Sequence, residues 1–91
     1  MKSILQEEKE CFVCGRTGLL HCHHVFGGTA NRKLSEKYGL KITLCMEHHT
    51  GAHGIHFHKP LDNQVKKMAQ KRFEEVYPDI NFRDVFGKNY L

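Results

Sequence analysis

Two short motifs, each placing two metal-binding side chains three positions apart, constrain this chain most. They are Cys11-x-x-Cys14 and Cys45-x-x-His48. Each puts two thiolate or imidazole ligands on one tight turn, and together they supply the four ligands of a closed tetrahedral zinc site. Their separation fits a zinc finger in which a hairpin lies between a cysteine knuckle and a helix. The sequence therefore predicts a structural Zn²⁺ at Cys11, Cys14, Cys45 and His48.

The length of the chain makes such a staple useful. With 91 residues it fits one domain, and a chain this short buries only roughly 60–65% of its unfolded surface. Residues 1–10 contain no apolar signal region, and no run approaches the ~20 apolar residues of a membrane span. We therefore expect a cytoplasmic protein with reduced thiols and no membrane partner, in which cysteine and histidine serve as metal ligands rather than in disulfides. The formal net charge of +4 permits an anionic partner without requiring one.

The fourth cysteine leaves one alternative open. Cys22 could replace His48 as the fourth zinc ligand. It has no second ligand three positions away, so we interpret it as a small core residue.

The hydrophobic pattern predicts an α+β protein with the order strand, loop, strand, short helix and helical tail. Residues 1–9 are polar and are expected to form a frayed or helical lead-in, and residues 25–31 a glycine-containing loop. The expected strands are 19–24 and 40–44, and the expected helices are a turn or two within 32–38, then 47–53, 61–77 and 82–86. The chain is predicted to be a single domain, 1–91, with a motif core at 11–54 and a helical tail at 61–91.

The remaining histidines also cluster. Positions i and i+4 share one helix face, so His49 and His53 can bind one metal ion. His48 lies about 100° around the helix from His49. One short helix can therefore serve two metal ions on two of its sides.

The pair His23-His24 suggests a division of labour, in which one imidazole binds a metal and the next activates water. A neutral imidazole near pH 7 is a suitable general base. Three neutral histidine ligands leave coordination positions open for a phosphate oxygen and a water molecule, which hydrolysis requires.

These motifs resemble the HNH endonuclease family, whose fold is a ββα-metal (His-Me, treble-clef) finger. The likeness lies in His21-Cys-His-His24, in Leu44-Cys-Met-Glu-His-His49 and in His53-Gly54, and covers residues 11–54. It is closest to the colicin-type DNases and the phage recombination-enhancing nucleases. The ending Phe86-Gly-Lys-Asn-Tyr-Leu91 is similar to small phage HNH proteins.

The resemblance implies a phosphodiester hydrolase that cuts DNA and leaves a 5′-phosphate, in the cytoplasm or, for a phage protein, in the bacterial host cytoplasm. Carried over by position, it implies His24 as the general base and His23, His49 and His53 as ligands of a catalytic divalent metal, Mg²⁺, Mn²⁺, Ni²⁺ or Zn²⁺. The sequence departs from the family about five positions before Cys45, where Leu40 replaces the usual Asn. Asn31 is the only asparagine nearby and does not align well with that position.

Other residues carry weaker signals. Basic side chains in residues 32–37 are candidates for contacts with DNA phosphates, namely Arg32, Lys33 and Lys37. Nothing in the spacing of His21, His56 and His58 demands a role. The alternative to a nuclease is a non-catalytic zinc-finger module that binds nucleic acid. Both functions use the zinc quartet, whereas only an enzyme needs the second set of histidines. The sequence leaves the preferred DNA structure and the oligomeric state open.

Overall fold

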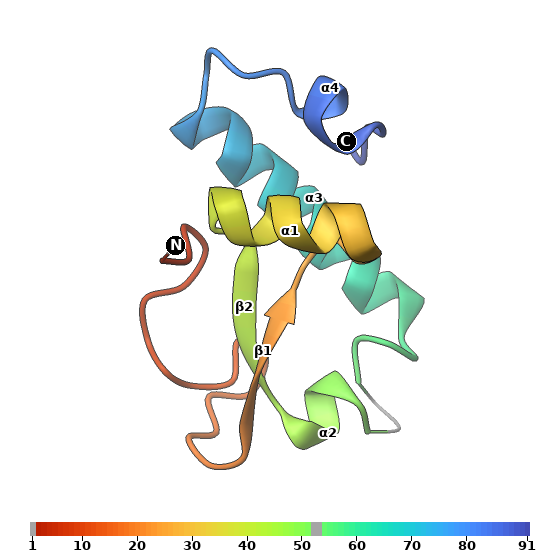
Figure 1. Cartoon of the computed structure of the whole chain (residues 1–91). Helices are drawn as coiled ribbons and strands as arrows, with labels where there is room; N and C mark the ends of the chain where they lie inside the picture. Colours follow the sequence, from red (N-terminus) through yellow and green to blue (C-terminus); the bar gives the residue numbers. More distant parts are fainter. Residues whose placement is uncertain (1, 52–53) are drawn as a thin grey trace.

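The computed structural model describes residues 2–51 and 54–91, which form an α+β fold around a two-stranded antiparallel sheet. The elements follow the order β1 (Leu20–His24), α1 (Thr29–Tyr38), β2 (Lys41–Cys45), α2 (Met46–His49), α3 (Lys59–Val76) and α4 (Phe82–Phe86). Helix α1 crosses one end of the sheet, α2 follows at its other end, and α3 runs diagonally past it (Figure 1). Both strands, the long helix and the last helix lie within two residues of their predicted bounds. None of the described helices is both long and apolar enough to cross a membrane.

The register of the sheet decides which side chains of β1 are buried. His23 pairs with Ile42 and Cys22 pairs with Thr43. Successive side chains of a strand point to opposite faces, so His23 joins the buried face while Cys22 is exposed. The interpretation of Cys22 as a core residue is therefore wrong.

Residues 2–9 form no helix and are held along β2 by hydrogen bonds, so the expectation of a frayed or helical lead-in is wrong for them. The backbone N–H of Ile4 donates to the Gly39 carbonyl at 2.9 Å, and the Thr43 N–H donates to the Gln6 side chain at 2.8 Å. A little further on, Phe12 N–H donates to the Thr43 carbonyl at 2.8 Å. The outer edge of β2 carries backbone groups that need partners, and the segment supplies them. This brings the cysteine knuckle beside the end of β2.

Helix α1 begins earlier than the sequence indicated. It starts at Thr29, so only the first part of the expected loop at 25–31 is a loop. It ends at Tyr38 and is capped by Gly39, whose φ of 72° is left-handed, and a Cβ at Gly39 would lie 2.4 Å from the Lys2 carbonyl oxygen. Only glycine fits this position. In the last turn, the buried Ser35 hydroxyl donates to the Phe26 carbonyl at 3.1 Å and accepts from the Phe26 N–H at 3.2 Å. These bonds hold the end of α1 against the segment that follows β1.

Helix α2 is shorter than the predicted 47–53, because the chain turns back immediately after it. It ends at His49, and the Ile55 N–H donates to the His48 carbonyl at 2.8 Å. A Cβ at Gly51 or Gly54 would lie 2.7 or 2.6 Å from the backbone of α2, so these glycines permit the close return. The buried Ile55 anchors the returning chain.

Helices α3 and α4 form much of the core. His58 caps α3, its Nδ1 accepting from the Leu61 N–H at 3.1 Å. The rings of Phe82 and Phe86 lie 5.2 and 4.8 Å from that of Phe26, two residues beyond β1, and Phe73 of α3 packs against Phe82. The residues expected to form a tail therefore share one hydrophobic core with the residues of the motif.

Candidate metal centres

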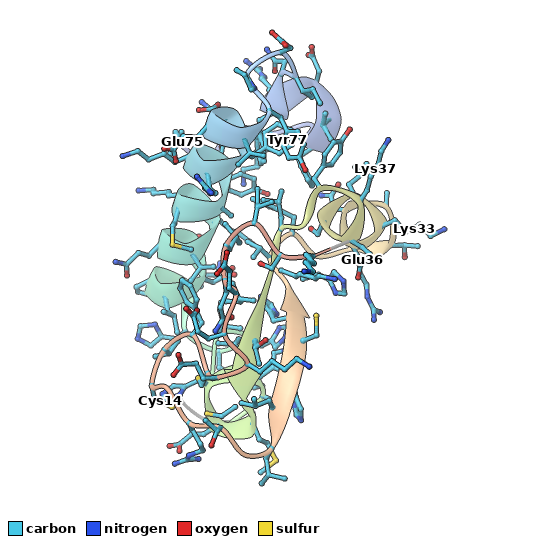
Figure 2. The ribbon with its side chains drawn as sticks, turned by 90° about the vertical axis from the view of Figure 1, so that its left-hand side faces the viewer. Cys14, Lys33, Glu36, Lys37, Glu75 and Tyr77 are labelled. Atoms are coloured by element: carbon cyan, nitrogen blue, oxygen red, sulfur yellow. The ribbon has the colours of Figure 1, made fainter. Side chains whose placement is uncertain are left out.

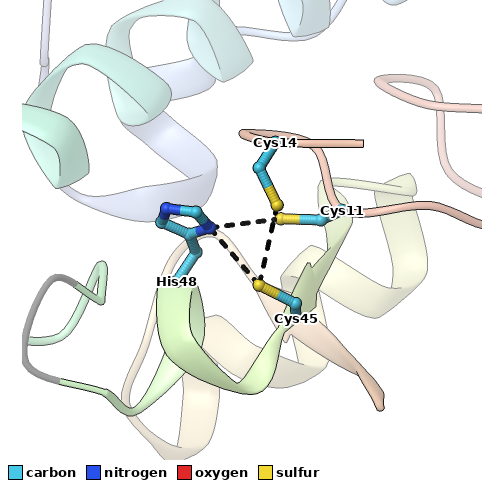
Figure 3. A group of neighbouring side chains, drawn as sticks. All are labelled: Cys11, Cys14, Cys45 and His48. Atoms are coloured by element: carbon cyan, nitrogen blue, oxygen red, sulfur yellow. Dashed lines mark hydrogen bonds between the residues drawn. The ribbon is translucent and has the colours of Figure 1, made fainter. Parts of the chain in front are cut away.

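The structure brings the Cys11-x-x-Cys14 motif of the N-terminal segment against the Cys45-x-x-His48 motif at the start of α2. The Sγ and Nδ1 atoms of Cys11, Cys14, Cys45 and His48 all lie within 4.8 Å of one another (Figure 3). Cys14 Sγ is 3.8 Å from Cys45 Sγ, and His48 Nδ1 is 3.3 Å from Cys45 Sγ and 3.7 Å from Cys11 Sγ.

These separations are those of ligands around one tetrahedral ion. Bonds of about 2.3 Å to sulfur and about 2.05 Å to nitrogen require S···S distances of about 3.8 Å and S···N distances of about 3.6 Å. The cluster therefore fits a structural metal ion.

The thiols of this cluster differ in acidity. Burial raises the pKa of Cys11, but the backbone N–H groups of Cys45, Cys14 and Val13 outweigh it and lower that pKa to about 6. The pKa of Cys14 is raised: the Arg16 backbone N–H lowers it, but desolvation and the neighbouring thiols have the larger combined effect. Of these two thiols, Cys11 more readily supplies the thiolate that a metal needs.

A second group of ligands lies on the other side of α2. The imidazoles of His23 from β1, His49 from α2 and His56 from the following loop each offer a nitrogen within 4.8 Å of the others. The Nε2 atoms of His49 and His56 are 3.1 Å apart. Ligand nitrogens on one tetrahedral or octahedral ion lie about 3.0–3.4 Å apart, so this spacing fits a shared metal ion.

The surroundings of His23 also fit a metal-binding role. Its side chain is buried, and among the residues that the structure describes its Nε2 has no hydrogen-bond partner. Burial, and next the neighbouring His49 and His56, lower its pKa to about 4. Burial, and next His56 and His21, also lower the pKa of His49. A neutral imidazole whose buried Nε2 has no partner is suited to bind a metal ion, since only the neutral ring binds a metal.

Sequence reasoning chose two of these three histidines. It named His53 rather than His56 as the third ligand, and His53 lies outside the described residues. We had assigned no role to His56, because its position depends on the return of the chain after α2. His21 also adjoins the group, with its Nδ1 3.0 Å from Nδ1 of His49. Metal-bound histidines usually have such a partner on the second nitrogen, which fixes the ring orientation.

His24 points to the opposite face of β1 from His23 but lies beside the same hollow. That hollow is lined by residues including His23, His24, His49, His56, Arg32 and Lys59. The His24 Nε2 lies 3.1 Å from Glu36 Oε1, and the second carboxylate oxygen of Glu36 accepts from Lys41 Nζ at 2.6 Å. The bond from Lys41, and next that from His24, lower the pKa of Glu36 to about 2.

The three basic candidates occupy different positions on α1. Arg32 lines the histidine hollow and, with Lys33, a second hollow beside it. Lys37 lines neither, and its Nζ lies 5.3 Å from the centre of the Tyr38 ring. Lys33 and Lys37 project from the outer side of the helix, whereas Glu36 lies on the side nearer the strands (Figure 2).

Comparison of the chain with protein-family models, with curated proteins and with solved structures finds no match. Any functional conclusion therefore depends on the residues and their geometry.

Proposed function

We propose that this protein is a metal-dependent DNA endonuclease of the HNH type, with a ββα-metal finger as its catalytic core. The observation that carries the proposal is the hollow that joins the three imidazoles of His23, His49 and His56 to His24 and Arg32. A zinc-finger module that only binds nucleic acid has no use for an open histidine site beside a second imidazole.

In this proposal the two clusters have different tasks. The quartet of Cys11, Cys14, Cys45 and His48 uses all its ligands on one Zn²⁺ and stabilises the fold. Within the part of the chain that the structure describes, the histidine group supplies three neutral ligands, which leaves coordination positions for substrate. A divalent ion bound there would act as a Lewis acid, polarising a phosphate oxygen and stabilising the negative charge of the leaving 3′ oxygen.

The side chains around the hollow supply the rest of the chemistry. His24 accepts a proton from the attacking water, and the resulting hydroxide forms a bond to phosphorus as the bond from phosphorus to the 3′ oxygen breaks. The products are a 5′-phosphate and a 3′ hydroxyl, whose proton comes from water. Arg32 lies within reach of the phosphate backbone and neutralises part of its charge. The net charge of +4 is compatible with DNA as the partner.

The test is a plasmid-nicking assay with the zinc-loaded protein and added Mg²⁺, Mn²⁺, Ni²⁺ or Zn²⁺. We expect wild-type protein to nick DNA, and His24→Ala to do so about 10²–10⁴-fold more slowly, with unchanged DNA affinity and only a small fall in melting temperature from the lost bond to Glu36. His58→Asn is the matched control, because His58 lies outside both clusters and asparagine also caps a helix. A wild-type protein that binds DNA but cuts it with none of these metals is a binding module, and the proposal is then wrong.

A further inference from the structure

Three side chains from three elements form a chain of contacts beside the proposed catalytic hollow. Glu36 of α1 holds His24 Nε2 at 3.1 Å with one carboxylate oxygen and Lys41 Nζ at 2.6 Å with the other. His24 and Lys41 are direct partners across the sheet, so their side chains lie on the same face of it. Glu36 bridges this pair.

The position of Glu36 is fixed by its neighbours in the chain. Ser35, fully buried, exchanges two hydrogen bonds with the backbone of Phe26, and its carbonyl accepts from the Leu40 N–H at 2.8 Å. Phe26 lies two residues after His24, and Leu40 one residue before Lys41. The backbone bonds of Ser35 therefore hold Glu36 next to the segments that carry His24 and Lys41, and the Glu36 carboxylate contacts both of these side chains directly.

We propose that Glu36 is the positioning residue of His24, and that Lys41 holds the carboxylate in place. A carboxylate can only accept, so Nε2 of His24 must carry the hydrogen that it donates to Glu36. In the neutral ring this leaves Nδ1 with the free lone pair. Glu36 thus selects the tautomer and the ring orientation, and Nδ1 becomes the proton acceptor. The acceptor role rests on the proposed nuclease function, whereas the hydrogen bond does not.

The first experiment reads the hydrogen bond directly by NMR of the zinc-loaded protein with ¹⁵N-labelled histidine. We expect a His24 Nε2 proton that exchanges slowly and resonates downfield in wild type, is lost in Glu36→Ala and is kept in Glu36→Gln, whose side-chain oxygen still accepts. Glu75→Ala is the control: it removes a carboxylate from the exposed surface of α3, well away from Glu36 (Figure 2). A His24 signal that is unchanged in Glu36→Ala overturns the proposal.

The second experiment is a double-mutant cycle on the nicking rate. Glu36→Ala should lower kcat about 10–100-fold with little change in KM, as is typical when the partner that orients a functional histidine is removed. In a His24→Ala background the same change should have an effect below about twofold. Equal effects in both backgrounds would show that Glu36 acts elsewhere, and would overturn the proposal. If the wild-type protein cuts no DNA, the nuclease proposal fails and the NMR result alone decides the role of Glu36.

Discussion

Replacing His23 with methionine should have opposite effects on stability without and with the second metal ion. His23 is only 7% exposed, and within residues 2–51 and 54–91 its Nε2 has no hydrogen-bond partner. A buried polar atom left in this state costs about 1–3 kcal/mol. Methionine is apolar and of similar length, so without the second metal His23→Met should raise the free energy of unfolding at pH 7.5 by about that amount. This corresponds to a rise in Tm of roughly 4–24 °C.

Without the second metal, the stability advantage of His23→Met over wild type should grow in mild acid. The pKa of His23 is lowered to about 4 from the ordinary 6.5. Between these values the unfolded chain binds a proton that the folded protein does not bind, so wild-type stability falls as the pH falls. From pH 7.5 to pH 5 the loss is about 2 kcal/mol, and His23→Met should be free of it.

Binding of the second metal ion should make wild type more stable than His23→Met. An ion bound only by the folded wild type at 100 times its Kd stabilises it by about 2.7 kcal/mol, and the variant gains little. The assay is urea unfolding of protein with one zinc equivalent verified at each pH, with and without added Mn²⁺ or Ni²⁺. His58→Asn is again the control, since His58 is exposed and lies outside both clusters. If His23→Met is less stable than wild type without added metal at both pH values, the reasoning from the unpaired nitrogen is refuted.

Three further predictions follow from the two clusters and the basic helix. Stripping zinc with a chelator, or Cys45→Ser, should unfold the domain, because a structural zinc contributes about 10–16 kcal/mol; circular dichroism with elemental analysis tests this, and a folded sample with under about half an equivalent of zinc contradicts it. His49→Ala should abolish nicking and binding of the second metal ion but keep one zinc, because His48, not His49, belongs to the quartet. Loss of that zinc would mean that the ligands are wrongly divided between the sites. Replacing the three basic residues of α1 (Arg32, Lys33 and Lys37) with alanine should weaken DNA binding and reduce the slope of log K against log salt by about 0.9 per lost phosphate contact. An unchanged slope would exclude these residues as phosphate contacts.

The features that sequence reasoning predicted well are local ones. The Cys-x-x-Cys and Cys-x-x-His spacings hold each pair of ligands on one turn, so the quartet needed only one long-range approach, between Cys11 and Cys45, to form. The sequence also predicts helix α3, because its apolar positions recur every three or four residues over many turns.

The features that could not be predicted depend on how distant segments meet. His56 reaches the histidine group because Gly51 and Gly54 allow the chain to fold back against α2, and helical periodicity says nothing of such a turn. Glu36 belongs to no sequence motif, and its role emerges only from its contacts with His24 and Lys41, which the sheet register pairs. The N-terminal segment is polar and carries no strand pattern, yet the exposed edge of β2 gives it a place.

The two clusters also imply an order in which the ions are taken up. Neighbouring residues of the four-residue helix α2, His48 and His49, serve different clusters. A helix this short does not hold its shape alone, so His49 has no fixed position until the quartet has closed around its ion. During refolding from a metal-free state, zinc should therefore bind first and the histidine group should acquire affinity only afterwards. Adding the second ion before zinc should then give no faster recovery than adding zinc alone, and the supply of zinc would determine how much of the protein can become active.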